Sequence, residues 1–201
     1  VLDVGCGSGR FIKYLRDQKG CRCVGLEFND KAIKTALADQ LDIRKEFVQQ
    51  HSEDPSHKYD IVCTFQVLEH IAEAGDFLEH VIKCVKPGGL VIICVPNNTP
   101  YFFSYDKYHT LNMPPHHMNM WNKDSMEALG RYYGMTTVNI HQEPLSRFRF
   151  YSKVYLEHLY KLKPGLRNFH FLNYPLTILK SILNRKKIFA GSIMGVYRVK
   201  G

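Results

Sequence analysis

The sequence predicts a doubly wound α/β fold in a single domain of 201 residues. Short apolar runs alternate with segments of helical periodicity, which is the pattern of βαβ units around a parallel sheet. A glycine-rich turn joins the first apolar run to the first helical segment. With 45% hydrophobic and 23% charged residues, the chain is typical of globular proteins and can bury a core without disulfide or metal staples.

The first part of the chain is expected to contain three strands, at residues 1–4, 21–27 and 46–49. Two helices are expected between them, at residues 10–19 and 31–39. Helical spacing places three apolar residues on the inner face of the first helix: Phe11, Ile12 and Leu15. Asn29 or Asp30 can cap the second helix, because a short polar side chain there accepts a bond from a free backbone N–H.

The remaining strands are expected at residues 59–65, 90–95, 135–141 and 192–199, with helices at 77–85 and 125–133. The run from Tyr59 to Phe65 is apolar after Asp60, as in a strand buried on both faces. Pro87 and the two glycines after it end the helix before the next strand, because proline cannot extend a helix and glycine accommodates the turn. A loop rich in Tyr, Pro and His follows that strand and extends to His117.

Charge is distributed unevenly along the chain. The formal net charge is +8, but residues 147–201 hold 12 basic residues and a single acidic one, Glu157. This asymmetry indicates an anionic partner, such as a phosphate, a lipid headgroup or a nucleic acid. A basic face that only keeps the protein in solution is the alternative.

The cysteines and the apolar runs indicate the cellular compartment in which the protein is expected. The six cysteines form no CxxC pair, and four of them lie in or beside apolar runs, so we expect reduced core residues of a cytoplasmic protein. The longest apolar run, residues 90–95, is too short to span a bilayer, so no transmembrane helix is expected. No signal peptide is visible, but the chain opens on Val1 without an initiator methionine, so its start says nothing about secretion.

The sharpest signal is the turn Asp3-Val4-Gly5-Cys6-Gly7-Ser8-Gly9 between a strand and a helix. Glycines let the backbone approach a ligand, and the free N–H groups at a helix start favour a negatively charged group. Glu27 stands at the end of the next strand, where a carboxylate can accept bonds from both hydroxyls of a ribose. Dinucleotide folds usually carry G-x-G-x-x-G, and here Arg10 occupies the place of the third glycine, which disfavours NAD.

This turn closely resembles the first motif of class I S-adenosylmethionine-dependent methyltransferases. Further segments up to about residue 142 match that family: Glu27, Tyr59-Asp60-Ile61-Val62, Val67-Leu68-Glu69-His70-Ile71 and Val85-Lys86-Pro87-Gly88-Gly89-Leu90. The resemblance implies a methyltransferase with a Rossmann-like sheet, mostly parallel with an antiparallel last strand. It also implies S-adenosyl-L-methionine as cofactor and S-adenosyl-L-homocysteine as product.

The resemblance also implies the residues that bind the cofactor: Asp3, Gly5, Cys6, Gly7, Gly9, Glu27, Phe28, Gln50 and Gln66. The contact to adenine comes from a residue after the third strand in this family, and residues 50–54 leave several candidates open. Three histidines are candidate bases for proton removal. His116 and His117 lie in the loop after the fifth strand, and His70 lies just past the fourth, both at the edge where such sheets bind ligands.

Metal binding is an open alternative at His70, because quinone-pathway O-methyltransferases resemble this region with a Glu-x-x-Glu-His arrangement. Here Gln66 replaces the first carboxylate, so no metal is expected. The stretch from Pro114 to Leu129 resembles small-molecule methyltransferases of ubiquinone, glycan and natural-product pathways. That likeness favours a small-molecule or lipid-like acceptor, methylated at a hydroxyl.

Three regions are expected: a cofactor-binding core at 1–146, a basic and aromatic insertion at 147–187, and a final core strand at 188–201. The insertion is predicted to form two short helices, broken at Pro164-Gly165 and at Pro175. It is too short for its own core, so we expect it to cap the acceptor site and to bury its aromatic residues against the sheet edge. Its charge suits an acceptor with phosphate or carboxylate, or peripheral contact with an anionic membrane.

Two other functions compete with this interpretation. A nucleic-acid methyltransferase would explain the basic tail, but the Asn-Pro-Pro-Tyr type of motif is absent where Phe65-Gln66-Val67-Leu68 stands. A non-catalytic binding module would keep the fold without the reaction. The intact glycines and Glu27 argue against that reading.

Overall fold

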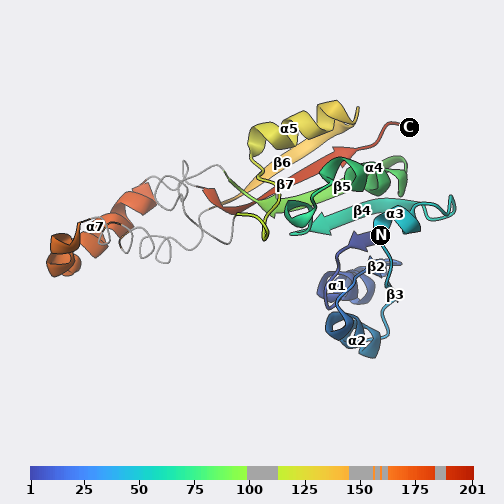
Figure 1. Ribbon diagram of the computed structural model, residues 1–201, viewed down its shortest axis with the longest axis horizontal. Helices are drawn as coiled ribbons and strands as arrows, with labels where there is room; N and C mark the ends of the chain where they lie inside the picture. Colours follow the sequence, from blue (N-terminus) through green and yellow to red (C-terminus); the bar gives the residue numbers. More distant parts are fainter. Residues whose placement is uncertain (99–112, 145–155, 157–158, 160–162, 184–188) are drawn as a thin grey trace.

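The computed structural model describes residues 1–98, 113–144, 156, 159, 163–183 and 189–201. Its centre is a seven-stranded sheet in the order β3-β2-β1-β4-β5-β7-β6 (Figure 1). The strands are β1 (Leu2–Val4), β2 (Val24–Leu26), β3 (Ile43–Arg44), β4 (Tyr59–Phe65), β5 (Val85–Pro96), β6 (Thr136–Pro144) and β7 (Phe189–Arg198). Strands β1 to β5 are parallel, while β7 runs antiparallel to both β5 and β6. The expected mostly parallel sheet with an antiparallel last strand is confirmed.

The described helices are α1 (Arg10–Lys19), α2 (Asp30–Ala38), α3 (Val48–His51), α4 (Ala74–Lys83), α5 (Lys123–Tyr132) and α7 (His170–Leu183), with 3₁₀ turns η1 (Leu68–His70) and η3 (Pro164–Phe169). The expected cap of α2 is present, because the Asn29 side chain accepts a bond from the backbone N–H of Ala32. Residues of α4 and α5 pack with β1, β4, β5 and β7 in the main core. A smaller core joins Ile12 of α1, Ala36 of α2 and Leu41.

The strand order indicates the edge of the sheet at which a ligand would bind. Along the chain the sheet grows outward from β1 in one direction through β2 and β3, and then in the other through β4 and β5. The carboxyl ends of β1 and β4 therefore flank a topological switch point, where open α/β sheets bind their ligands. The middle of β4 is fully buried, as expected, at Val62, Cys63 and Thr64. All six cysteines are free thiols.

The third strand differs from its prediction. Strand β3 covers Ile43 and Arg44, which pair with Gly25 and Leu26, whereas Val48 to His51 form α3. Gln50 stabilises the start of this helix, since its side-chain oxygen accepts a bond from the backbone N–H of Phe47 at 3.0 Å. Apolar residues at 47 and 48 gave no signal that separates a short strand from one helical turn.

The insertion before β7 also differs from its prediction. Pro175 lies inside α7 and does not break it. The helix loses the one bond that proline cannot donate, and the Thr177 hydroxyl adds a bond of 2.8 Å to the Asn173 carbonyl in the same turn. The expected burial of aromatic residues is wrong for Phe169 and Phe171, which are exposed. Phe11, expected on the inner face of α1, is also partly exposed and contacts the ring of Phe65 edge-on at 5.0 Å.

Helix α7 lies at the far end of the molecule from β1, β2 and β3 (Figure 1). It is fastened to η3, where the Asn173 side chain donates to the Leu166 carbonyl at 3.1 Å. The cap predicted for residues 147–187 stays a prediction, because much of that segment lies outside the described residues. Within the described part of the chain, no helix is both long and apolar enough to cross a bilayer.

Candidate functional site

The glycine turn follows β1 and is bound to the end of β2. The backbone N–H groups of Gly5 and Cys6 both donate to the Leu26 carbonyl, at 2.8 and 3.0 Å. Gly5, Gly7 and Gly9 have φ values of +79°, +54° and +74°, in the left-handed region that favours glycine. The loop shape therefore favours glycine at all three positions.

The three glycines have different surroundings. A Cβ atom on Gly5 would lie 2.3 Å from Cγ2 of Val67, and one on Gly9 would lie 2.4 Å from Cδ1 of Leu41. A Cβ atom on Gly7 would meet nothing within 4 Å. Gly5 and Gly9 thus permit close packing within the protein, while Gly7 faces open space that a ligand can fill.

Glu27 lies beside this open space. Its Oε2 accepts a bond from the N–H of Gly7 at 2.8 Å, and its Oε1 accepts bonds from the N–H groups of Phe28 and Asn29 at 2.7 and 2.9 Å. A carboxylate has about four acceptor positions, so three bonds orient it and leave capacity for a ligand hydroxyl. The structure thus brings the predicted acid and the predicted turn together.

An exposed aromatic pair adjoins the acid. The rings of Phe28 and Phe47 lie 4.1 Å apart at 32°, and both are exposed. Two large apolar rings exposed beside a polar site form a platform for a flat ligand. Sequence reasoning included Phe28 but missed Phe47, because Phe47 was assigned to a strand and its position next to Phe28 is set by the fold.

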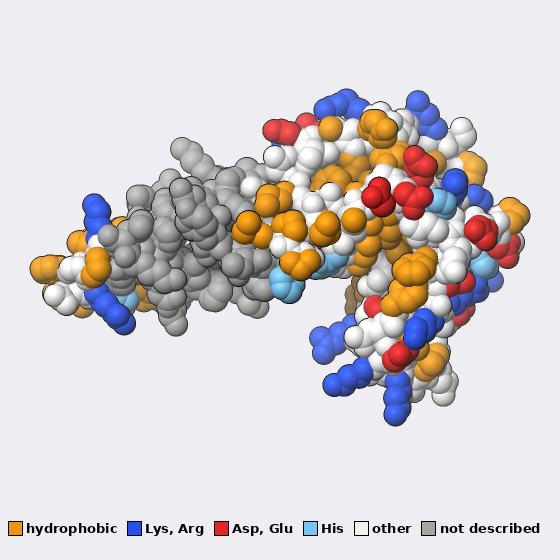
Figure 2. Space-filling model, viewed as in Figure 1, with side chains coloured by type: hydrophobic (Ala, Val, Ile, Leu, Met, Phe, Trp, Pro, Cys, Tyr) orange, Lys and Arg blue, Asp and Glu red, His pale blue; other side chains and the backbone are white. Residues whose placement is uncertain are grey.

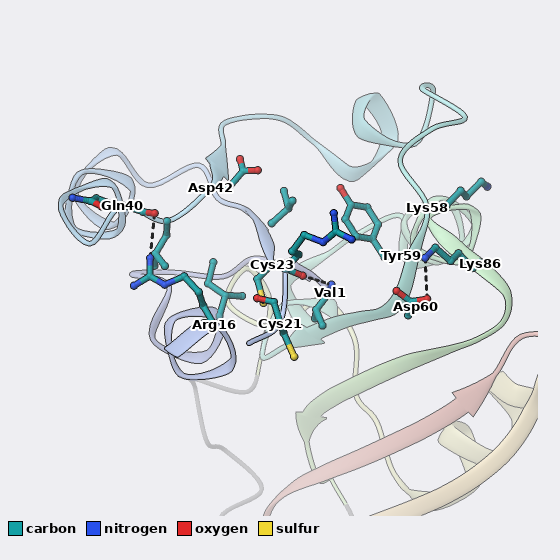
Figure 3. A pocket seen from close by; sticks show the side chains of 14 residues that line it. Val1, Arg16, Cys21, Cys23, Gln40, Asp42, Lys58, Tyr59, Asp60 and Lys86 are labelled. Carbon is teal, nitrogen blue, oxygen red and sulfur yellow. Dashed lines mark hydrogen bonds and ion pairs between the residues drawn. The ribbon is translucent and has the colours of Figure 1, made fainter. Parts of the chain in front are cut away.

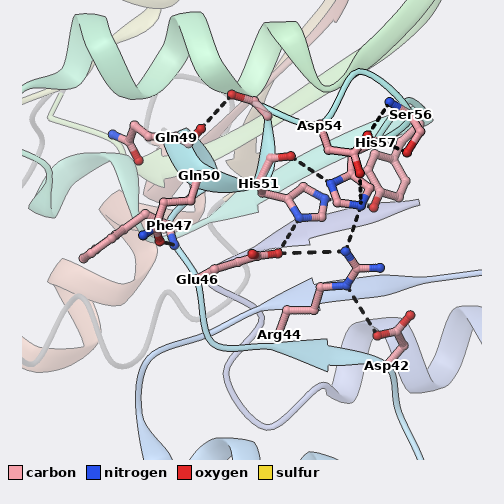
Figure 4. Close-up of polar contacts among 12 residues, drawn as sticks. Asp42, Arg44, Glu46, Phe47, Gln49, Gln50, His51, Asp54, Ser56 and His57 are labelled. Carbon is pink, nitrogen blue, oxygen red and sulfur yellow. Dashed lines mark hydrogen bonds and ion pairs between the residues drawn. The ribbon is translucent and has the colours of Figure 1, made fainter.

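A polar cluster surrounds His51 at the end of α3 (Figure 4). His51 is fully buried, with its Nδ1 at 2.6 Å from Glu46 Oε1 and its Nε2 at 2.9 Å from the Tyr59 hydroxyl. His57 stacks on His51 at 4.1 Å and lies 2.9 Å from Arg44. Burial lowers the pKa of His51, so the neutral ring is favoured in the folded protein.

Asp3 is a buried acid below the turn. It is 3% exposed, and the Cys63 thiol donates to its Oδ1 at 3.6 Å. Burial, with a smaller contribution from the nearby Glu27 carboxylate, raises the pKa of Asp3 to about 6, although the hydrogen bond from Cys63 opposes the rise. Burial and the same two carboxylates raise the pKa of Cys6 to about 12, so Cys6 is a neutral thiol that lines the turn.

The other predicted cofactor residues have modest roles in the structure. Gln66 follows β4 with φ of +57°, and its N–H donates to the Cys94 carbonyl at 2.8 Å. This conformation is uncommon for a residue other than glycine and marks a sharp turn where β4 reaches the ligand edge. Gln50 uses its side-chain oxygen on the Phe47 N–H, as described above. Gln50 therefore holds the aromatic platform in position.

Two of the predicted histidines meet next to the glycine turn. His70 lies in η1, which directly follows Val67, the residue packed against Gly5. The rings of His70 and His117 lie 5.0 Å apart, edge to face, although 46 residues separate them in the sequence. His116 contributes its backbone carbonyl, which lies 2.5 Å from Nδ1 of His70, while its side chain is exposed.

The His116 carbonyl fixes the state of the His70 ring. A carbonyl oxygen can only accept, so Nδ1 of His70 carries the proton and Nε2 of the neutral ring is free to accept one. The loop is held there by the backbone N–H groups of Met118 and Asn119, which donate to the Glu69 carbonyl at 2.7 and 3.2 Å. The arrangement suits a general base at the sheet edge.

A buried carboxylate completes this cluster. The Glu69 side chain is 2% exposed, its Oε1 lies 3.9 Å from Nε2 of His70, and burial raises its pKa. Its Oε2 has no hydrogen-bond partner among the described residues. Ligand atoms of Glu69, His70 and His117 lie within 4.8 Å of one another, close enough to ligate one cation.

A separate cavity of about 620 Å³ lies at the opposite edge of the sheet (Figure 3). Its lining includes Val1, Lys58, Tyr59 and Lys86, which stand before or at the amino ends of β1, β4 and β5. Ligands of open α/β sheets bind at the carboxyl ends of the strands. The cavity is therefore distinct from the candidate site.

Comparison with known proteins agrees with the geometry. An ubiquinone biosynthesis O-methyltransferase of Nitrosospira multiformis is 30% identical over 124 residues, which are 57% of this chain and 52% of that protein. The enzyme of the same name from Caulobacter vibrioides is 34% identical over 105 residues, 49% of this chain and 41% of that protein. The matched region thus spans about half the length of these relatives.

Solved structures share the fold. A SAM-dependent methyltransferase from Archaeoglobus fulgidus superposes with a TM-score of 0.66 at 20% identity, over 98% of this chain and 84% of that one. A family profile described as a methyltransferase domain matches residues 1–140, which include the glycine turn, Glu27 and the Glu69-His70 turn. The chain therefore belongs to this methyltransferase-domain family.

Proposed function

We propose that this chain binds S-adenosyl-L-methionine at the carboxyl edge of β1, β2 and β4 and transfers its methyl group to a hydroxyl of a small-molecule or lipid-like acceptor, with S-adenosyl-L-homocysteine as product. The observation that carries the proposal is the pairing of Gly7 with Glu27. Open space lies over Gly7, and Glu27 is oriented beside it by three backbone bonds.

The residues at the edge fit the parts of this cofactor. Glu27 has one acceptor position left for a ribose hydroxyl, and Phe28 with Phe47 provides apolar rings for the adenine. The buried carboxyl of Asp3 favours the positively charged methionine end, because a cation offsets the cost of ionising a buried acid. Gly7 leaves room for the backbone to contact the cofactor.

When bound, the cofactor supplies a methyl group already activated by its sulfonium, so the protein chiefly positions the two reactants. In the proposal His70 takes the proton from the acceptor hydroxyl on Nε2, because its Nδ1 is committed to the His116 carbonyl. His117 packs against the ring and limits its rotation. His116 contributes through its backbone.

The class of acceptor rests on two kinds of support. The relatives described above are named O-methyltransferases, which favours oxygen as the methylated atom. The 12 basic residues after position 146 favour an acceptor with phosphate or carboxylate. A cytoplasmic location is part of the proposal and is supported by the free thiols.

Calorimetric titration with S-adenosyl-L-methionine tests the binding step. Glu27→Gln retains the size of the side chain but replaces one accepting oxygen with a donor, so affinity is expected to fall by about 2 to 3 kcal/mol. Glu79→Gln is the matched control, since Glu79 is exposed on α4 near the amino end of β5, away from the turn. Equal affinity of both variants and the parent would refute the assignment. Tighter binding of RNA than of cofactor, lost in high salt, would favour a nucleic-acid acceptor.

A further inference from the structure

Helix α7 presents its apolar side to solvent. Phe171, Leu172, Leu176 and Leu179 are 71%, 51%, 61% and 52% exposed, and Pro175 is exposed among them. These five residues, here called the α7 face, follow the spacing i, i+1, i+4, i+5 and i+8 and so form one stripe of the helix. Thr177, on another side, is buried. Surface helices of globular proteins normally have the reverse arrangement, with the apolar stripe inward.

The sequence around α7 is basic. Residues 158–187 contain seven basic residues and no acidic one. Two of the seven, Lys163 and Arg167, are exposed at η3, immediately before the helix. Figure 2 shows hydrophobic and basic side chains together at this end of the molecule. An apolar stripe near the exposed Lys163 and Arg167 is complementary to a surface with an apolar interior and anionic headgroups.

We propose that the α7 face docks on the surface of an anionic phospholipid bilayer. The apolar stripe enters the boundary between headgroups and acyl chains, while Lys163 and Arg167 contact the headgroups. The helix lies in the surface and does not cross it, because its 14 residues reach only about 21 Å against a hydrocarbon core of about 30 Å.

The charge of the segment favours an anionic bilayer over a second copy of the chain as the partner of the α7 face. Two copies that pair through their α7 faces would bring two segments of the same strong positive charge together, which opposes association. An anionic bilayer supplies the opposite charge along with the apolar interior. The docking needs neither the cofactor nor methyl transfer, so it is independent of the proposed activity.

Sedimentation of the whole chain with vesicles tests the proposal. Vesicles of phosphatidylglycerol and phosphatidylcholine in equal parts are expected to carry the protein down, and phosphatidylcholine vesicles are not. Leu172→Ser with Leu176→Ser is expected to weaken binding to the anionic vesicles by at least about tenfold, because two leucines no longer enter the bilayer. Raising the salt concentration is expected to weaken the parent's binding by screening the headgroups.

The control variant is Leu37→Ser with Tyr132→Ser, which removes two comparably exposed apolar side chains from α2 and α5. It is expected to bind vesicles as the parent does. Equal binding of the parent to neutral vesicles, or an equal loss in the control, would overturn the proposal. So would a lower melting temperature of the Leu172 and Leu176 variant, since the face would then be buried in solution. Sedimentation equilibrium that shows a dimer lost in this variant, with vesicle binding retained, would assign the face to self-association.

Discussion

Replacing Gly7 with alanine tests whether this glycine is required for cofactor binding or for the stability of the fold. The added methyl group meets no protein atom within 4 Å, so the folded chain has room for it. The φ of +54° still strains any residue with a Cβ, at a cost of about 1 to 2 kcal/mol. For a domain of this size, such a loss lowers the melting temperature by a few degrees, at about 2 to 4 °C per kcal/mol.

Gly20 is a matched control at the other end of α1. Its φ is +63°, and a Cβ there also meets nothing within 4 Å, so Gly20→Ala carries the same backbone strain away from the site. Both variants are expected to show the same small loss of stability. Only Gly7→Ala adds an atom where the cofactor would lie, and overpacking of about 1 to 3 kcal/mol corresponds to about a five- to 150-fold loss of affinity.

The assay combines thermal unfolding with calorimetric titration of S-adenosyl-L-methionine and S-adenosyl-L-homocysteine. We expect Gly20→Ala to bind both compounds like the parent and Gly7→Ala to bind neither with parental affinity. If the two variants bind alike, the cofactor does not approach Gly7 and the site has been placed wrongly. If Gly7→Ala is far less stable than Gly20→Ala, the residue serves the fold, and the distinction from Gly5 and Gly9 fails.

Three further predictions concern titrating groups. Asp3→Asn is expected to weaken cofactor binding and to raise the unfolding free energy at pH 8 by up to about 3 kcal/mol, because the raised pKa of about 6 makes ionised Asp3 unfavourable above that pH. The gain in stability should shrink as the pH falls towards 5. A gain that does not depend on pH in urea titrations would contradict this. His51→Gln is expected to lose less stability than the parent as the pH falls below about 6.5. In the parent, the lowered pKa of His51 favours the neutral ring, and its stabilisation is lost as acid protonates the ring. Equal urea midpoints of variant and parent across pH 5 to 7 would contradict the burial of this ring. His70→Ala is expected to slow methyl transfer about a hundredfold or more with unchanged cofactor affinity, whereas His116→Ala retains near-parental turnover because its carbonyl remains. The rates are measured with the first hydroxyl compound that gives turnover. The reverse order of rates would assign the base to His116.

The sequence predicted best where structure depends on neighbouring residues. Helix α1 has the bounds expected from its apolar spacing, and Glu27 lies beside the turn because parallel strands end at one edge. The different roles of Gly5 and Gly7 could not be predicted, since they depend on Val67, which is distant in sequence. Local patterns describe a backbone, and they do not say which side chains from elsewhere meet it.

The same reason explains the errors. Phe47 and Val48 form an apolar pair that fits either a strand or a helical turn, and the choice is made by the buried contacts of His51. The contact between His70 and His117 spans a loop whose path no periodicity describes. The aromatic residues before β7 were expected to be buried because the segment is too short for its own core, but Phe169 and Phe171 are exposed.

Two sets of backbone hydrogen bonds hold the base of the loop after β5, and they bear on which sequence changes the histidine cluster can tolerate. The Asn98 N–H donates to the Trp121 carbonyl at 2.7 Å, and the Glu69 carbonyl receives the N–H groups of Met118 and Asn119. These bonds close the base of the loop on both sides of His116 and His117. The place of His116 and His117 is therefore set by main-chain atoms, so substitutions that leave the backbone at Met118, Asn119 and Trp121 intact are expected to keep the histidine cluster in position.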